Sequence, residues 1–424
     1  MSQSSGIAPF TPYQKRVVAL LAVVQFTIIL DFMVMSPLGD MLMKTMHLNA
    51  SQFASAVSAY AFSAGLSGLL AAGFADKYDR KKLLLFFYTG FIAGTLVCAL
   101  STSYPMLLAG RIVTGLFGGV LGSISFAIVA DLFEYNQRGR VMGFVQMAFA
   151  VSQVAGIPVG LYLANRIGWH APFLLIIGMS LLTAIAVIRL LRPVSRHIGR
   201  QGQVNALSHL RKTVSNGRYL LPFITTALLS IGGFMLMPFS TAFTINNVCI
   251  NQAQLPLIYV IIGLSSMVIL PLIGRLSDRL GKLPTFFAGT TVAMVMVVIY
   301  THLTPVPVWQ LIVINALMFA GIMSRMIPSS ALMTAIPRPD DRGAFMSITS
   351  SLQQIAGGVA SVIAGWIIVQ EPGGRLLHFD RVGYVSLVIM VLCAALMWRI
   401  NSRVEKELQQ KKTVAVSTEE NLAV

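Results

Sequence analysis

The sequence is poor in charged residues for its length. Only 11% of its 424 residues are charged, and its 15 acids face 31 lysines and arginines. A soluble domain would carry roughly 25% charged residues, because these residues cover its surface. Hydrophobic residues make up 56% of the chain, and the mean hydropathy is +0.76. The composition therefore excludes an ordinary soluble fold and indicates a protein surrounded by lipid.

Residues that build metal and catalytic centres are also scarce. The three cysteines, Cys98, Cys249 and Cys393, are scattered, which predicts neither a disulfide framework nor a metal cluster. The six histidines are dispersed, and the sequence has no H-x-x-x-H spacing and no P-loop. We therefore expect no metal, no cofactor, no enzymatic activity and no use of ATP.

Long apolar runs account for most of the chain, and a bilayer needs about 20 such residues per helix. The first run follows Lys15 and Arg16 without an A-x-A cleavage pattern, which predicts an uncleaved first span. The fold class predicted is an all-α membrane protein with twelve spans, at 17–39, 52–75, 83–101, 106–129, 141–165, 170–191, 219–245, 255–276, 284–302, 309–335, 344–369 and 382–400.

Basic residues predict the orientation of these spans. A cytoplasmic N-terminus places 25 of the 31 lysines and arginines on the inner side and four outside, while Arg111 and Arg325 fall inside spans. Cytoplasmic loops carry such an excess, so the net charge of +16 reflects topology and not nucleic-acid binding. We expect a multi-pass protein of the inner (plasma) membrane with both termini in the cytoplasm.

The chain divides into two similar halves. Asp76 and Asp278 lie 202 residues apart after the second and eighth spans, and Arg138-Gly139 precedes Arg342-Gly343 by 204 residues. Parallel repeats of this kind place a substrate site between the halves, near the midplane. The predicted domains are an N-terminal six-helix bundle, a cytoplasmic linker, a C-terminal six-helix bundle and a polar tail that is disordered after a short helical extension, at 1–191, 192–217, 218–403 and 404–424.

Four motifs carry a family resemblance. Residues 274–282, GRLSDRLGK, match the pattern G-x-x-x-D-[RK]-x-G-[RK], and the first-half copy departs from it at Ala72 and Asp79. With this loop motif, the chain resembles the major facilitator superfamily, in particular its twelve-span drug:proton antiporter branch. The other three motifs are Leu30-Asp31-x5-Pro37, Leu107-x3-Arg111-x3-Gly115-x2-Gly118 and Gly156-x-Pro158-x-Gly160.

The resemblance implies a proton-coupled antiporter that exports small molecules such as drugs, sugars or metabolites by alternating access. Efflux of this kind confers multidrug resistance in some members. The implied partners are a small-molecule substrate, protons and membrane lipid, and we expect a monomer. An uptake symporter of the same fold is the alternative, and a membrane sensor without transport activity is a third.

The resemblance also implies a latch at the loop motif that holds one alternating state. In the family, the loop aspartate meets the start of span eleven, here near Gly343, and an arginine such as Arg80 pairs with an acid at the end of span four. The alternative is that these basic loops only follow the positive-inside rule. The latch residues are Asp76, Arg80, Lys81, Asp131, Gly274, Asp278, Arg279, Gly281 and Lys282.

Asp31 is the only acid deep inside a predicted span. A charge there is costly, so we expect Asp31 to face a cavity or a partner and to exchange protons. At 1.5 Å per residue, Asp31 lies roughly 12 Å and Arg111 roughly 8 Å from the outer surface, so the two are at compatible depths. The alternatives are a structural hydrogen bond for Asp31 and a snorkelling side chain for Arg111.

Gly156, Pro158 and Gly160 predict a bend in span five, which in antiporters is thought to seal the pathway; ordinary close packing is the alternative. Arg325 has no acid nearby in sequence, and it either attracts an anionic substrate, pairs across the cavity or snorkels. The candidate cavity residues are Gln25, Phe26, Gln146, Thr226, Phe234, Asn315, Arg325, Gln353 and Gln354.

Overall fold

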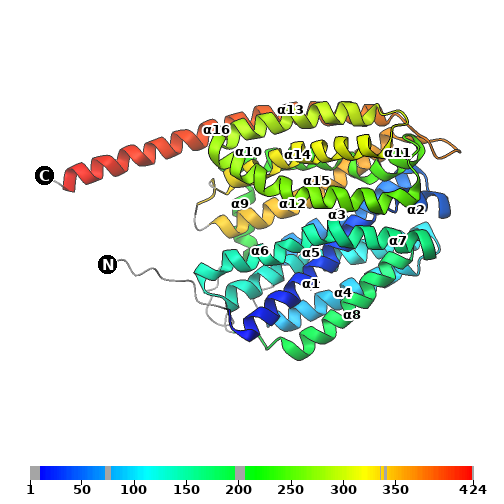
Figure 1. Cartoon of the computed structure of the whole chain (residues 1–424). Helices are drawn as coiled ribbons and strands as arrows, with labels where there is room; N and C mark the ends of the chain where they lie inside the picture. Colours follow the sequence, from blue (N-terminus) through cyan, green and yellow to red (C-terminus); the bar gives the residue numbers. More distant parts are fainter. Residues whose placement is uncertain (1–9, 72–77, 196–205, 335, 339–340, 423–424) are drawn as a thin grey trace.

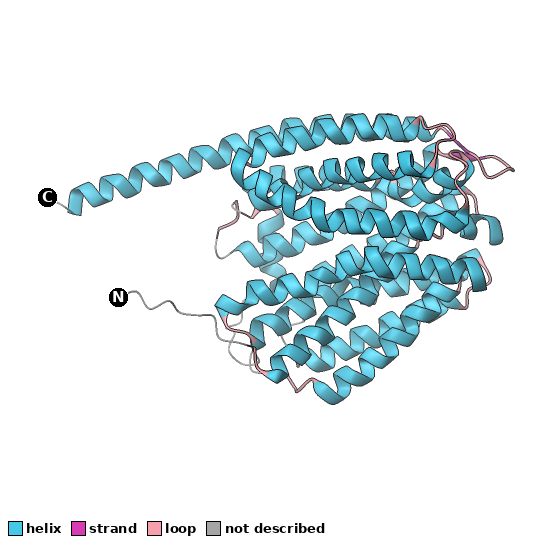
Figure 2. Cartoon of the chain, viewed as in Figure 1, coloured by secondary structure: helices cyan, strands magenta, loops and turns pink. Residues whose placement is uncertain are grey.

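The computed structural model describes residues 10–71, 78–195, 206–334, 336–338 and 341–422. This part of the chain is almost entirely helical, and its one described sheet is a two-stranded hairpin (Figure 2). The all-helical fold class predicted from the apolar runs is confirmed.

In the first half, two of the predicted spans are interrupted helices. Span 17–39 stops after Val34 and resumes beyond Pro37, which has no backbone N–H to continue the ladder. Span 141–165 contains a five-residue π-helical turn just before Pro158. The first-half elements are α1 (Pro12–Val34), α2 (Gly39–Thr45), α3 (Ala50–Ala71), α4 (Arg80–Ala99), α5 (Tyr104–Leu132), α6 (Tyr135–Val151), η2 (Ser152–Gly156), α7 (Ile157–Ile167) and α8 (Ala171–Leu190).

The second half repeats the first interruption. Span 219–245 breaks before Pro238, which stands 201 residues after Pro37, and a short helix again follows. The elements are α9 (Ala206–Val214), α10 (Gly217–Phe234), η3 (Met237–Phe239), α11 (Ser240–Asn246), η4 (Gln252–Gln254), α12 (Leu255–Leu280), α13 (Lys282–Thr301), α14 (Val308–Met333), α15 (Arg342–Ile367), β1 (Val369–Gln370), β2 (Leu376–Leu377) and α16 (Phe379–Leu422).

Two expectations about loops and tails were wrong. The tail at 404–424 was expected to be disordered, but α16 continues as a helix to Leu422, and its sequence from 401 onward contains neither Gly nor Pro. The second loop motif was expected after its span, but α12 extends through Leu280, so Gly274 and Asp278 lie on the helix. Gly281, with φ of 93°, ends the helix in a conformation that favours glycine.

The helices pack as two groups, the N-terminal lobe (α1–α8) and the C-terminal lobe (α10–α16), as Figure 1 shows. The lobes meet through α3 against α15 and through η2 and α7 against α12. Glycines allow this close approach, since a Cβ on Gly65 would lie 2.6 Å from Ile355 and one on Gly263 would lie 2.8 Å from Val154. Both chain termini lie at one end of the molecule, here called the terminal end, and α2 and α11 lie at the opposite, distal end.

Eleven helices in the described part of the chain are long and apolar enough to cross a membrane. The predicted span at 344–369 corresponds to α15, which has 26 residues but is rich in serine, threonine and glutamine. Its polar residues face the other lobe and the cavity described below, which explains the weak apolar signal. The twelve-span count, the cytoplasmic termini and the domain boundaries stay predictions.

Candidate functional site: a buried ion pair beside an inter-lobe cavity

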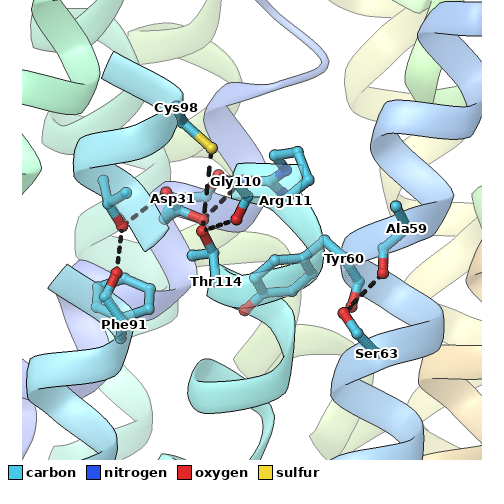
Figure 3. A network of polar contacts seen from close by, with 10 residues as sticks. Asp31, Ala59, Tyr60, Ser63, Phe91, Cys98, Gly110, Arg111 and Thr114 are labelled. Atoms are coloured by element: carbon cyan, nitrogen blue, oxygen red, sulfur yellow. Dashed lines mark hydrogen bonds and ion pairs between the residues drawn. The ribbon is translucent and has the colours of Figure 1, made fainter. Parts of the chain in front are cut away.

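Asp31 of α1 and Arg111 of α5 form an ion pair inside the N-terminal lobe (Figure 3). Arg111 Nη1 donates to Asp31 Oδ2 at 2.7 Å, and both side chains are 0% exposed. Charge-assisted hydrogen bonds of this length are strong where water is excluded. The structure thus brings together the two charges for which the sequence predicted compatible depths in the membrane. The Arg111 side chain does not snorkel to the membrane surface.

Two other helices contribute to the surroundings of the pair. The Thr95 hydroxyl of α4 lies 3.5 Å from Asp31 Oδ1, and the Tyr60 ring of α3 faces the Arg111 guanidinium at 4.6 Å. Arg111 Nε and Nη2 are buried without a hydrogen-bond partner in the described part of the chain. Sequence analysis missed Thr95 and Tyr60, because only packing of α3 and α4 against α5 brings them to the site. Asp31 is the single acid that balances this guanidinium.

The ion pair is sealed from the space between the lobes in this conformation. Neither Asp31 nor Arg111 lines the inter-lobe cavity described below; of the two expectations for Asp31, a cavity or a partner, the structure shows the partner, Arg111. The next residue, Phe32, does line the cavity, and its ring packs on Tyr60 at a centroid distance of 5.4 Å. Two aromatic rings therefore separate the guanidinium from the cavity. A movement of Arg111 or of the cavity wall at Phe32 acts on the other through these rings.

The inter-lobe cavity has two connected parts, of about 300 and 170 Å³. Five residues line both parts: Phe32, Ser36, Phe234, Met237 and Met326. Among the predicted cavity residues, the structure places four on the lining, namely Phe234, Asn315, Gln353 and Gln354. It places the other five elsewhere, namely Gln25, Phe26, Gln146, Thr226 and Arg325.

The larger part of the cavity has mostly apolar walls with hydroxyl groups at intervals. Thr241 pairs with the Tyr259 hydroxyl at 2.9 Å, and Thr244 lies 3.2 Å from the Tyr300 hydroxyl. Methionines on both lobes, including Met33 and Met318, complete the wall, and flexible thioethers adapt to ligands of different shape. No charged side chain lines either part of the cavity in the described residues.

A polar seam closes the distal end between the lobes. Asn246 of α11 donates to Asp40 Oδ1 of α2 at 2.5 Å, and Lys44 Nζ bonds both Asp40 and Asn246 at 2.9 Å. Asp40 is 1% exposed. Nearby, the Ser36 hydroxyl donates to the Met237 carbonyl. Asn165 Nδ2 donates to the Gln252 carbonyl at 3.3 Å, and Gln252 Nε2 donates to Asn165 Oδ1 at 3.1 Å. Sequence analysis missed Asp40 because it lies just beyond the predicted first span.

The loop-motif residues are distributed over both lobes. Arg80 Nε lies 3.3 Å from Asp131 Oδ2, as the family resemblance implied, and Lys81 donates to the Ile188 carbonyl at 2.8 Å. Asp76 lies outside the described residues. In the second copy, Asp278, Arg279 and Lys282 are exposed, and Asp278 forms no hydrogen bond or ion pair among the described residues. The contact of this aspartate with the start of α15 stays a prediction.

The bend motif connects the ion pair to the other lobe. A Cβ on Gly156 of η2 would lie 2.8 Å from Leu30, the neighbour of Asp31, and Pro158 is the second residue after the π-helical turn. On the opposite side, Val154 of η2 packs against Gly263 of α12. The widened turn therefore contacts α1 beside the buried acid and the C-terminal lobe at once. Gly160 lies one turn further, and a Cβ there would lie 3.5 Å from Val34.

Two lobes of apolar helices around a shared cavity, with an ion pair buried in one lobe, define a membrane transporter. The sequence pattern of the Major Facilitator Superfamily matches residues 21–327 and 222–420, and the chain belongs to this family. It is therefore a multi-pass integral protein of the inner membrane, as predicted.

Individual relatives extend this result. The chain is 24% identical over 383 residues to the uncharacterized MFS-type transporter YceJ of Bacillus subtilis (strain 168), covering 89% of this chain and 94% of the relative. It is 27% identical to a probable sugar efflux transporter of Helicobacter pylori (strain G27), over 45% and 48% of the two chains. The fold resembles a bacterial homolog of the human lysosomal transporter Spinster in an inward-facing and occupied conformation, with 14% identity, a TM-score of 0.73 and coverage of 93% and 98%.

Proposed function

We propose that this transporter is a proton-coupled antiporter that exports small molecules by alternating access, with Asp31 as the proton carrier. The observation that carries the proposal is the ion pair between Asp31 and Arg111, both 0% exposed. A proton that binds Asp31 neutralises the carboxylate and breaks its ionic bond to Arg111. The guanidinium, which keeps its charge, then needs a new arrangement of its neighbours.

Two contacts link this event to the cavity. Phe32 lies between the Tyr60 ring and the substrate space, and η2 connects Leu30 with α12 of the other lobe. A shift of α1 on protonation therefore acts both on the cavity wall and on the lobe interface. Coupling requires such differential contacts, because a ligand shifts a conformational equilibrium only through unequal interactions with the two states.

The proposal includes an orientation. The seam of Asp40, Lys44 and Asn246 closes the distal end, and the basic loops of the sequence favour a cytoplasmic terminal end. The described conformation is then the one closed toward the outside. We further propose that α15 also crosses the membrane, as the eleventh of twelve spans, that both termini are cytoplasmic and that the monomer is the transporting unit, acting without a cofactor.

The test uses purified protein in proteoliposomes with an imposed pH gradient and a panel of labelled sugars, drugs and organic acids. In an antiporter, the transported compound moves against the direction of proton flow. Movement with the protons indicates the uptake symporter, and flux without response to the gradient contradicts proton coupling.

The decisive variant is the double substitution Asp31→Asn with Arg111→Gln, which removes both charges and leaves no unpaired ion. We expect exchange of labelled compound across equal pH to persist, while the response to the gradient is lost. The matched control is Glu134→Gln, which changes an exposed acid between α5 and α6 that makes no side-chain cap hydrogen bond. Full gradient dependence in the double variant would remove Asp31 from the coupling role.

A further inference from the structure

Arg325 of α14 is a second buried arginine, in the C-terminal lobe. Its side chain is 1% exposed, and it lies eight residues from Met333, the last residue of α14. At 1.5 Å per residue this is a depth of about 12 Å, too far for the guanidinium of a fully buried side chain to reach the surface. A snorkelling role is therefore inconsistent with its position.

The charge of Arg325 has no acidic partner in the described part of the chain. Its Nε and Nη2 are buried without a hydrogen bond, the Phe286 ring lies 5.9 Å away, and the Cys393 thiol is a neighbouring polar group. A buried ion without compensation is costly, and ionisable groups within membrane spans usually mark a substrate or ion pathway. The structure itself supplies no group that balances this cation.

The uncompensated charge lies directly behind the wall of the substrate cavity. Gly232 of α10 lines the cavity, and Arg325 Nη1 is 3.9 Å from the point where a Cβ of Gly232 would stand. Ile322 and Met326, one turn before and one residue after Arg325, line the cavity as well. The wall between the guanidinium and the cavity is thus little more than a glycine backbone.

The remaining charges near the cavity cancel. No charged residue lines the described cavity, and Asp31 and Arg111 neutralise each other. In an apolar space the field of a single cation extends over several ångströms, lowering the free energy of an anion and raising that of another cation. The potential in the cavity is therefore positive.

We propose that the molecule carried by this transporter bears an acidic group, and that Arg325 is the residue that determines this preference. The inference rests on the proposed function, since it assigns a substrate class to the same cavity. A bound carboxylate or other anion balances the buried charge of Arg325. A neutral or cationic analogue of the same shape leaves the lobe with its unpaired charge.

The test measures binding to the purified full-length protein in detergent, without a pH gradient. The probes are three matched triads of acid, neutral analogue and amine: naphthylacetate, naphthylacetamide and naphthylethylamine; hexanoate, hexanamide and hexylamine; galacturonate, galactose and galactosamine. We expect at least one acid to bind, with a Kd lower than that of its neutral analogue by on the order of tenfold and the amine weakest. Binding of no acid, equal binding within each triad or a preference for an amine would overturn the proposal.

Two independent variants assign the preference to Arg325. Arg325→Gln removes the charge, and Cys393→Asp keeps the charge but places a carboxylate beside it. We expect both to reduce the discrimination between acid and neutral analogue to less than about twofold. Cys393→Asn, which matches Asp in shape but lacks its charge, retains the discrimination. A preference that survives Cys393→Asp would refute the assignment even if Arg325→Gln did not fold.

This binding assay is separate from the test of coupling. Acid preference without gradient-driven flux would leave the substrate inference standing and remove the proton coupling. Gradient-driven flux of neutral compounds with no acid preference would leave the proton coupling standing and overturn the substrate inference.

Discussion

Arg111 of the N-terminal lobe and Arg325 of the C-terminal lobe are fully buried, and the two arginines have opposite environments. Arg111 in the N-terminal lobe bonds Asp31 at 2.7 Å, whereas Arg325 in the C-terminal lobe has no acid beside it in the described residues. Both are at most 1% exposed, so burial alone does not separate them. The difference is one carboxylate, which neutralises the buried charge of Arg111 and is missing beside Arg325.

The comparison indicates that the two lobes have different roles. The neutral pair can accept a proton and lose its ionic bond, while the unpaired cation can be neutralised only by a molecule from outside the lobe. Proton and substrate would then bind in different lobes, and coupling would pass through their contacts at Phe32 and η2. Substitutions that remove the acid beside Arg111, or place one beside Arg325, test this difference.

The largest effect is expected from Asp31→Asn, which leaves Arg111 as unpaired as Arg325. Breaking a buried ion pair from one side costs about 3–5 kcal/mol of stability. We expect a marked drop in the unfolding temperature in detergent, and recovery of most of it when Arg111→Gln is added. The comparison is Arg325→Gln, which removes an uncompensated charge and should leave the unfolding temperature unchanged or raised. Equal stability of Asp31→Asn and the native protein would mean that the two arginines do not differ energetically.

The second test interrupts the contact through which the N-terminal lobe reaches α12. In Gly263→Val the new Cβ would lie 2.8–3.1 Å from Val154, including its backbone, so η2 must move. Overpacking of this kind costs about 1–3 kcal/mol. We expect gradient-driven flux to fall while the Kd of an acidic probe changes less than about twofold, because Arg325 is untouched.

Gly178→Ala is the matched control for this test, since no atom lies within 4 Å of its Cβ position. A parallel loss of binding and flux in Gly263→Val would show that the two lobes do not act separately.

Cys393→Asp makes the opposite change, because it gives Arg325 the partner that Arg111 already has. A hydrogen bond to a charged group contributes about 1.5–3 kcal/mol, so we expect a higher unfolding temperature than for Cys393→Asn. Differential scanning fluorimetry of the two variants at one pH measures this difference. If the aspartate variant were the less stable of the two, Arg325 would already be compensated within the native protein.

Sequence alone predicted the N-terminal site better than the C-terminal one, for a physical reason. Asp31 stands out as an acid within an apolar run, and helix rise places Arg111 at its level, so depth suffices to pair them. Arg325 also stands out, but an unpaired charge is defined by what surrounds it, which only packing of α10, α14 and α16 reveals.

The apolar runs likewise located the spans but not their interruptions. The breaks before Pro37 and Pro238 turn α2 and α11 toward each other, and the seam they form joins Asp40 and Asn246, which are 206 residues apart. No periodicity within either helix predicts such a contact. The polar composition of α15 is similarly a property of the cavity and of α3, not of the helix itself.

The smallest effect is expected at this seam, where Asp40 and Lys44 of α2 bond to Asn246 of the other lobe. Lys44 is 48% exposed, so its bond to Asp40 is partly screened, and Asp40→Asn should cost about 1 kcal/mol. The loss occurs only in the conformation closed at the distal end, so the population shifts toward the open one by roughly fivefold. The measurement is the rate at which a membrane-impermeant maleimide, added from the distal side, labels Ser36→Cys in a Cys249→Ser background, since Cys249 is exposed while Cys98 and Cys393 are buried. Thr45→Ala on the same helix is the control and should leave the rate unchanged; an equal rate in Asp40→Asn would show that the seam does not hold the distal end closed.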